Sequence, residues 1–414
     1  MTSPDQCLPH LPEPPTLPGT ISLRGPADVV ATLPYHLGYQ PTDSLVVIGL
    51  HSPPGTQRPS SGAHGTQLGF VARIDLPTRL DEVWPTADHV VSRVLAQTPQ
   101  EVLLVAYESG PAGSRPSGPL SSAVRDLLRD AGVEVAERLL VRDGRFWSLD
   151  CAATCCPVEG LPVPDPVEVP AVADYVLLGR SPLRHRDELA GLIAPSEEDG
   201  AQDDGRRATV VELGRAFQRS GPRGPATGPR LVGRSRRRQL LRDWGLEAWR
   251  SLLTEGSPPS RLDGADRWSP LAPAPAAPAG SGLARPPDIG VLLAASLRDV
   301  TLRDLVITWL CPGSLDLGLL DPDLVARAQS VLPADPPQES SVVHRLAALC
   351  RSAPTGTAAA PLTVLANVVW WHGDGALAST ALDLALADEP DYRLAVLLER
   401  MLDLAISPRR QPTT

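Results

Sequence analysis

Hydrophobic and polar positions follow two different periods along the chain, and they predict an α/β part followed by a helical part. Residues 44–50 and 101–107 are continuous apolar runs, which indicate central strands covered on both faces. Residues 68–76 alternate between apolar and polar positions, as in a strand with one exposed face. Residues 76–99 and 119–132 have the spacing of covering helices. The order of these elements predicts strands and helices packed in layers.

A hairpin completes the predicted sheet. Residues 135–150 contain two alternating arms joined by Asp143 and Gly144, which favour a type I′ turn. We therefore expect a mixed sheet of about five strands with helices, an α/β sandwich. Ser181 and Pro182 are placed to begin a further helix, the first as N-cap and the second at the first helical position.

The chain divides into five segments by these patterns. Its fold class is α/β, with a mixed-sheet sandwich at the N-terminus followed by an all-α domain. The predicted segments are a disordered tail at 1–20, the α/β domain at 21–198, an Arg-rich and Pro/Ala-rich linker with one or two helices at 199–287, the all-α domain at 288–406, and a tail at 407–414.

Composition places the chain among soluble globular proteins, with 42% apolar and 21% charged residues. No apolar run approaches the ~18 residues that span a bilayer, so we expect no membrane partner. The N-terminal residues have neither a basic start nor a continuous apolar stretch, so they do not resemble a signal peptide. We expect a cytoplasmic protein.

The absence of lysine excludes some chemistry. All 38 basic residues are arginine. Schiff-base catalysis and the phosphate-gripping lysine of a P-loop both need a primary amine, so both are excluded. There is also no G-x-S-x-G nucleophile elbow and no H-E-x-x-H zinc helix. We expect no cofactor.

Several stretches carry a resemblance to a known family. They are "ISLRGPADVVATLPYHLGYQPTDSLVVIGL", "FVARIDLP", "LVRDGRFWSLDCAATCCPVEG", "LRDVTLRD" and "LANVVWWHGDGALASTALDLALADEPDYRLA". In order and spacing they resemble the actinobacterial family catalogued as domain of unknown function 4192. The resemblance implies a cytoplasmic protein of high-GC bacteria and brings no activity with it.

The last of these stretches is also similar to one tetratricopeptide repeat. Gly373, Asp374, Ala378, Ala385 and Pro390 stand at the spacing of that consensus, where small residues let two antiparallel helices pack closely. A stable solenoid needs about three repeats, and only one is evident. We interpret the stretch as a helical hairpin that completes an α-bundle.

Polar residues at the ends of the two central strands are candidates for binding a ligand. His51 ends one strand, and Tyr107 and Glu108 end the other. If the strands are adjacent and parallel, these side chains line one crevice, with Arg73 and Asp75 nearby. A histidine and a glutamate there could support acid/base chemistry. Polar residues at strand ends are equally common in sheets that bind nothing.

The stretch from Leu33 to Leu50 is predicted to turn a helix into a strand. Gly25 and Pro26 are suited to begin a helix, and Pro34 should kink it or start a second short turn. Gly38 is placed to end that turn in a left-handed conformation, and Asp43 to cap the reversal before the strand. His36 has no evident structural role, so we keep it as a ligand-binding candidate.

A basic segment raises the question of nucleic acid. Residues 206–250 contain twelve arginines against three acidic residues, in a chain of net charge −10. Two tryptophans in it could stack on bases. The alternative is a solvated segment whose arginines pair with acidic surfaces, its tryptophans forming a buried stripe. The nucleic-acid candidates are Arg234, Arg236, Arg237 and Arg238.

Three clustered cysteines are weak candidates for a metal site. Cys151, Cys155 and Cys156 are spaced C-x-x-x-C-C, whereas structural zinc needs four ligands, usually two C-x-x-C pairs or histidine partners. Reduced thiols are the simpler interpretation. Cys311 and Cys350 lie on apolar helix faces and are expected in the core.

Two classes of function remain. We favour a non-catalytic protein-interaction or ligand-sensing protein, in which the helical module docks a partner protein in a groove between helices. A small molecule as ligand remains open. The alternatives are an enzyme that uses the strand-end crevice and a nucleic-acid-associated protein that uses the arginine segment.

Overall fold

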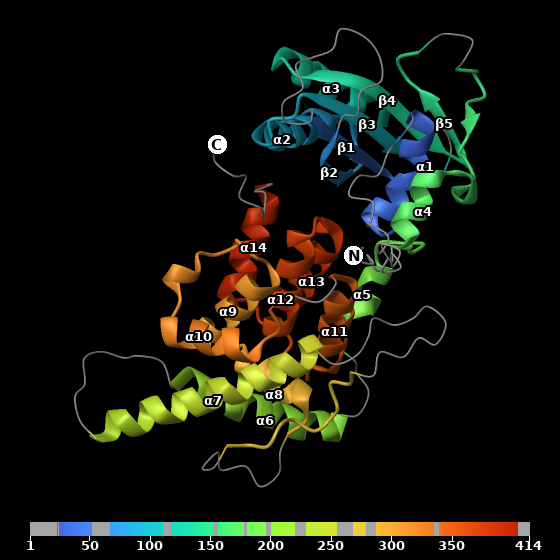
Figure 1. The fold of residues 1–414 in the computed structure, drawn as a ribbon. Helices are drawn as coiled ribbons and strands as arrows, with labels where there is room; N and C mark the ends of the chain where they lie inside the picture. Colours follow the sequence, from blue (N-terminus) through green and yellow to red (C-terminus); the bar gives the residue numbers. More distant parts are fainter. Residues whose placement is uncertain are drawn as a thin grey trace, which may run out of the picture.

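The computed structural model describes residues 23, 25–51, 67–110, 117–151, 156–177, 180–195, 200–219, 229–254, 268–278, 287–334 and 339–404. An N-terminal part contains the sheet, and a C-terminal part is helical (Figure 1). The predicted fold class, α/β followed by all-α, is confirmed. The tails predicted at 1–20 and 407–414 lie outside the described residues.

The described sheet is mixed and has six strands. They are β1 (Ser44–His51), β2 (Gln67–Asp75), β3 (Glu101–Tyr107), β4 (Glu134–Arg142), β5 (Arg145–Ser148) and β6 (Leu161–Pro162), in the order β2-β1-β3-β4-β5-β6. Among these strands only β3 and β4 run parallel. Asp143 and Gly144 join β4 to β5 with φ of 50° and 72°, as the predicted type I′ turn requires.

Helices cover both faces of the sheet (Figure 1). On one face, α2 (Val83–Ala96) and α3 (Ser117–Asp130) share a core with Leu45 and Val47 of β1. On the other, α1 (Pro26–Leu37) packs over Val46 and Ile48, and α4 (Pro170–Leu177) packs on α1. Alternate side chains of β1 therefore pack into the cores on opposite faces of the sheet, which explains its continuous apolar run.

The predicted corner between α1 and β1 exists, with one difference. Gly38 ends α1 in the left-handed region at φ 80°, and Asp43 adopts φ 40° just before β1. The Asp43 carboxylate accepts bonds from the Ser109 backbone N–H at 2.9 Å and from its hydroxyl at 2.7 Å. Pro34 neither ends the helix nor starts a second turn, because α1 runs through it to Leu37.

The remaining described elements are helical. They are α5 (Glu188–Ile193), α6 (Gly200–Arg219), α7 (Pro229–Thr254), α8 (Ile289–Ser296), α9 (Val300–Leu310), α10 (Pro322–Val331), α11 (Glu339–Ser352), α12 (Ala359–Trp371), α13 (Gly375–Asp388) and α14 (Arg393–Asp403), with single 3₁₀ turns at Leu80–Glu82, Pro166–Glu168 and Leu317–Leu319. None of the described helices combines the length and apolar character needed to cross a membrane.

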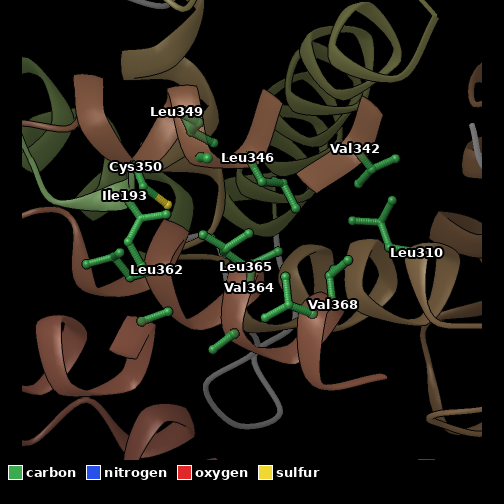
Figure 2. Packing of buried hydrophobic residues seen from close by; sticks show 14 of the residues in the cluster. Ile193, Leu310, Val342, Leu346, Leu349, Cys350, Leu362, Val364, Leu365 and Val368 are labelled. Atoms are coloured by element: carbon green, nitrogen blue, oxygen red, sulfur yellow. The ribbon is translucent and has the colours of Figure 1, made fainter. Parts of the chain in front are cut away.

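The helical core surrounds α8 and α12. Every side chain of α8 is buried, and Leu346, Leu349 and Cys350 of α11 meet Leu362 and Leu365 of α12 (Figure 2). Helices α12 and α13 lie antiparallel as a hairpin, and α14 packs on them. The buried thiols of Cys311 and Cys350 belong to this core, as their positions predicted.

Two helices of the segment predicted as a linker belong to this same core. Phe217 of α6 and Trp244 and Trp249 of α7 are buried there, and α6 and α7 both pack on α8. Helices α6 and α7 are therefore a structural part of the helical region, because their apolar faces find partners that follow them in the sequence.

The segment between the two domains is less helical than predicted. Leu183 pairs with Tyr39 as an isolated bridge, with a bond from Gln40 N–H to the Leu183 carbonyl at 2.8 Å. Leu183 is held in this bridge and residues 184–187 form bends and turns, so α5 begins at Glu188 and not at Pro182. The pairing also fixes the connecting segment beside the end of α1.

Candidate binding cleft between the domains

The crevice expected at the strand ends does not form. Strands β1 and β3 are adjacent but antiparallel, with Ser44 opposite Tyr107 and Leu50 opposite Glu101. Their carboxyl ends therefore lie at opposite ends of the sheet. His51 is separated from Tyr107 and Glu108 by the length of the strands, so the acid/base pairing imagined for them is wrong.

The residues of the expected crevice have structural surroundings. Glu108 is buried, accepts a bond from the Ser117 hydroxyl and pairs with Arg142 at 3.1 Å. The Tyr107 hydroxyl is buried, and no partner for it exists among the described residues. Burial raises the pKa of Tyr107. The His51 Nε2 lies 3.4 Å from the Gln97 carbonyl oxygen.

A different concavity brings three of the predicted residues together. A cleft of about 770 Å³ lies between the two domains, and His36, Arg73 and Asp75 line it. Its α/β wall is the end of α1, the strand β2 and one face of α2, while its helical wall is the turn between α12 and α13 and the end of α14. In Figure 1, β2 is the strand of the sheet nearest the helical domain.

Arginines in the cleft have buried donors that are not used. Arg73 pairs with Asp75 at 2.6 Å and donates from Nη2 to the Thr42 carbonyl at 3.3 Å, while its Nε is buried without an acceptor in the described chain. Arg93 of α2 lies 3.1 Å from His89 through Nε, and its Nη1 is likewise buried and unused. Buried donors of this kind are costly unless an acceptor arrives. The cleft thus contains two arginine donors that an acceptor would stabilise, beside the carboxylates of Asp75 and Asp374 on the same lining.

Charges from both walls gather around the Tyr39 hydroxyl. Burial raises the pKa of Tyr39, while the positive charges of Arg73 and Arg186 act to lower it. Asp75 and Asp374 act on the same hydroxyl in the opposite direction. Arg73 and Asp75 lie on β2, Arg186 lies on the segment between α4 and α5, and Asp374 lies at the start of α13.

Asp374 is the helical domain's charged contribution. Its carboxylate caps α13 by accepting from the Leu377 N–H at 2.9 Å. Burial nevertheless raises the pKa of Asp374, and the Arg180 guanidinium only partly opposes this. A nearby positive charge stabilises the ionised form of a carboxylate, and Arg180 supplies one here.

His36 joins the cleft to α4. Its Nδ1 lies 3.1 Å from the Tyr175 hydroxyl, and the two rings meet edge to face. Burial lowers the pKa of His36 to about 4, and the charge of Arg180 adds to the effect. The imidazole is therefore neutral at pH 7, and His36 has the structural partner that its sequence context did not reveal.

Arg180 links the connecting segment to the helical domain. It lies 3.9 Å from Glu339 at the start of α11, and the same carboxylate lies 3.2 Å from His372 at the end of α12. The positive charge of Arg180 acts to lower the pKa of both His36 and Asp374, so this residue interacts electrostatically with both walls of the cleft. A change in the separation of the two walls would alter the interactions of Arg180 with His36 and with Glu339.

Sequence reasoning missed most of the cleft. Arg93 lies on α2, Arg180 and Arg186 lie in the segment between α4 and α5, and His372 follows α12, so they have no shared local pattern. Asp374 was noticed only as part of the repeat-like spacing. The one local signal available was the run of two tryptophans, a histidine and Gly373-Asp374-Gly375, which places bulky and polar side chains beside a tight turn.

The arginine segment is largely structural where it is described. Trp244 and Trp249 are buried and donate to the Pro275 carbonyl and the Ser296 hydroxyl, so they cannot stack on bases. Arg242 is buried between Asp299 and Asp321, each at 2.8 Å.

The four nucleic-acid candidates differ in exposure. Arg236 and Arg237 are exposed, whereas Arg238 is partly buried and burial lowers its pKa. The side chain of Arg234 lies outside the described residues. Only two neighbouring arginines of this group are therefore seen on the described surface.

The cysteine cluster is only partly described. Cys151 and Cys156 are the described residues on either side of a gap. Cys155 lies in that gap, outside the described residues. Within the described ranges, no three side chains of His, Cys, Asp or Glu are grouped so as to hold a metal ion. The weak metal candidates therefore gain no support from the geometry.

Comparison with known proteins gives one match. The sequence profile of a family described as "Domain of unknown function (DUF4192)" matches residues 26–409, which include both domains and the whole cleft. No curated protein and no solved structure matches the chain.

Proposed function

The chain belongs to the family of the domain of unknown function DUF4192, and from this premise we propose that it is a non-catalytic binding protein that senses an anionic ligand in the cleft between its two domains. The observation that carries the proposal is the pair of buried, unused arginine donors, Arg73 Nε and Arg93 Nη1, on the lining of one cleft. An anion that accepts from both would replace two unfavourable buried donors with charge-assisted hydrogen bonds.

Sensing follows from the composition of the walls. A ligand that contacts β2 and the α12–α13 turn together binds best at one separation of the domains, and it therefore shifts the population toward that separation. The network of Arg180, Glu339 and His372 crosses the same boundary. Occupancy of the cleft would thus be felt in both domains.

The partner in this proposal is another protein that presents carboxylates, and a small anion is the simpler ligand to test. The hairpin of α12 and α13 contributes its turn, with Asp374, to the wall of the cleft. We therefore propose that the partner docks in the cleft, and not in a groove between helices as the sequence suggested. Neither a membrane nor nucleic acid is part of the proposal.

A panel of anions tests the proposal. We would measure thermal unfolding and calorimetric binding with citrate, inorganic phosphate and short acidic peptides at low ionic strength. At least one should bind, with an affinity that falls as salt is added, since ionic contacts are screened.

Matched variants locate the site. The double variant Arg73→Gln, Arg93→Gln should lose binding by about tenfold or more, because each removed charge-assisted bond contributes ~1.5–3 kcal/mol. Arg129→Gln, on an exposed arginine of α3 away from the cleft, should leave affinity within about twofold. The proposal is wrong if no anion binds. It is also wrong if the double variant binds as tightly as the wild type and the Arg129→Gln control.

A further inference from the structure

The two edges of the sheet are very different. One edge is β6, which is two residues long and contains Pro162. Short strands and prolines are common ways to prevent an edge from pairing with another chain. The other edge is β2, nine residues long and without proline, with Val71 and Ile74 among its residues. Of the two described edges, only β2 keeps a long template for a further strand.

The hydrogen bonds at one end of β2 reveal which backbone groups are available. The Leu76 N–H donates to the Asp43 carbonyl at 2.8 Å, next to the ladder in which Ser44 faces Asp75. Bonded and non-bonded pairs alternate in an antiparallel ladder, so Ile74 and Ala72 direct their N–H and C=O groups toward β1. Val71, Arg73 and Asp75 therefore direct theirs away from β1.

The cleft follows this edge. Six consecutive residues of β2, from Phe70 to Asp75, line it. Alternate side chains of a strand point to opposite faces, so a concavity that contacts all of them must run along the edge. The outward backbone groups of Val71, Arg73 and Asp75 thus open into the cleft and not into the bulk solvent.

Size and charge select the occupant. A strand of five residues fills roughly 800 Å³, given a strand spacing of ~4.8 Å, a layer thickness of ~10 Å and a rise of ~3.4 Å per residue. The cleft has about 770 Å³. Four arginines line it, Arg73, Arg93, Arg180 and Arg186, against the three aspartates Asp75, Asp374 and Asp403. Arg73 and Arg93 keep unused buried donors, whereas Asp75 is paired with Arg73 and Asp374 accepts from the Leu377 N–H. The unused donors complement aspartate or glutamate side chains on the occupant.

We propose that the free edge of β2 binds an extended acidic segment of a partner protein, which adds to the sheet as a seventh strand inside the cleft. This inference rests on the proposed function and narrows its ligand to a peptide. Backbone bonds to Val71, Arg73 and Asp75 hold the segment, and its carboxylates meet the arginines. Recognition thus combines a sequence-independent backbone contact with a requirement for negative charge.

The decisive test uses the unmodified full-length protein. The probe is a fluorescent, acetylated heptapeptide of alternating valine and aspartate, and its affinity is measured by fluorescence anisotropy. Peptides with one N-methylated amide at each successive position remove one N–H donor at a time. Strand addition predicts that methylation at every second position weakens binding about tenfold, while methylation between these positions changes it less than about threefold.

A pair of variants tests the same contact from the protein side. Val71→Pro removes an N–H that β1 does not use, so the sheet should persist, whereas the added strand loses a donor. Val71→Ala keeps the N–H and is the matched control. We expect Val71→Pro to bind the heptapeptide at least about tenfold more weakly than Val71→Ala, with circular dichroism spectra that match.

The outcomes separate this inference from the proposed function. If citrate or phosphate binds in an Arg73- and Arg93-dependent manner but the heptapeptide does not, the inference is wrong and the proposed function holds. A methylation scan without alternation also overturns it. An equivalent heptapeptide of valine and arginine that binds equally well removes the role of charge. If β2 instead pairs with a second copy, Val71→Pro would dissociate a dimer in sedimentation, and the inference is again wrong.

Discussion

Asp43 illustrates how much one side chain can determine at a corner. It adopts a left-handed φ of 40°, which aspartate tolerates better than alanine, and its carboxylate holds Ser109 on the loop that follows β3. We predict that Asp43→Ala lowers the free energy of unfolding by about 1–2 kcal/mol. Urea denaturation would measure it. Asp43→Asn keeps the backbone preference and one acceptor, so it should cost less than half as much; equal costs would contradict this account.

His36 predicts a dependence of stability on pH. The folded state keeps its imidazole neutral down to about pH 4, whereas the unfolded chain takes up the proton near pH 6.5. The unfolded state therefore binds more protons between these values, so stability is fully present above pH 6.5 and falls as the pH falls toward 4.

The matched variant for this residue is His36→Gln, which keeps a polar group near Tyr175. Between pH 7.5 and pH 4.5 the wild type should lose about 1–2.5 kcal/mol more of its unfolding free energy than the variant. Guanidinium denaturation at the two pH values measures the difference. Parallel losses in the two proteins would show that His36 does not contribute.

For single residues, the sequence predicted the local backbone conformation better than the tertiary contacts of the side chain. The left-handed position of Gly38 and the turn at Asp143 follow from local backbone preferences, and both are confirmed. Asp43 does bind a backbone N–H, but that of Ser109, 66 positions away, and not one at the reversal itself. The partner of His36 and the place of Arg93 in the cleft could not be predicted, because Tyr175 lies 139 positions from His36 and the cleft joins segments across the whole chain. Local chemistry fixes conformation, while a binding site depends on tertiary proximity.

Helix α7 shows the same contrast at the scale of an element. Its arginines suggested a nucleic-acid surface, yet Arg242 is buried and bridges Asp299 and Asp321. These carboxylates also cap α9 and α10. One arginine thus joins the middle of one helix to the starts of two others, and the apolar face of α7 completes the packing.

We predict a large effect from removing this bridge. Arg242→Ala should lower the unfolding free energy by about 3–5 kcal/mol, because it leaves the buried Asp299 carboxylate without its cation. Arg250→Ala removes an exposed arginine of the same helix that pairs with Glu247, and it should cost no more than about 0.5 kcal/mol. Chemical denaturation followed by tryptophan fluorescence compares the two. A cost for Arg242→Ala as small as that for Arg250→Ala would be inconsistent with a structural bridge.

The relative direction of the strands could not be predicted from the sequence pattern. Strands β1 and β3 were identified correctly from their apolar runs, but an apolar run does not indicate whether two adjacent strands pair parallel or antiparallel. Their antiparallel pairing arises because β1 is followed by its neighbour β2, and α2 then leads back to β3 on the other side of β1. The misplaced crevice of His51 and Glu108 is a direct result of this ambiguity.

The domains depend on each other at the scale of the molecule. The core beneath α1 continues through Leu189 and Ile193 of α5 into the helical domain. The helical domain also forms the second wall of the cleft along β2. A fragment of residues 21–195 would therefore expose both an apolar surface and a complete strand edge.

We predict that this fragment self-associates at micromolar concentrations at which the full chain does not aggregate. Sedimentation velocity would measure the distribution of species for both. Val71→Pro in the fragment should reduce the higher species, because part of the association uses the edge of β2. A monodisperse fragment would contradict the protective role of the helical domain.

The free edge of β2 has a consequence for the segment that pairs with it. A segment whose backbone groups are already paired within its own protein has none available for β2, so it must first leave that pairing. The partner must therefore present this segment as a disordered stretch, which becomes ordered only on arrival. Ordering a chain costs conformational entropy and weakens the net affinity. The complex should consequently form and dissociate readily, which is the behaviour that a reversible sensor needs.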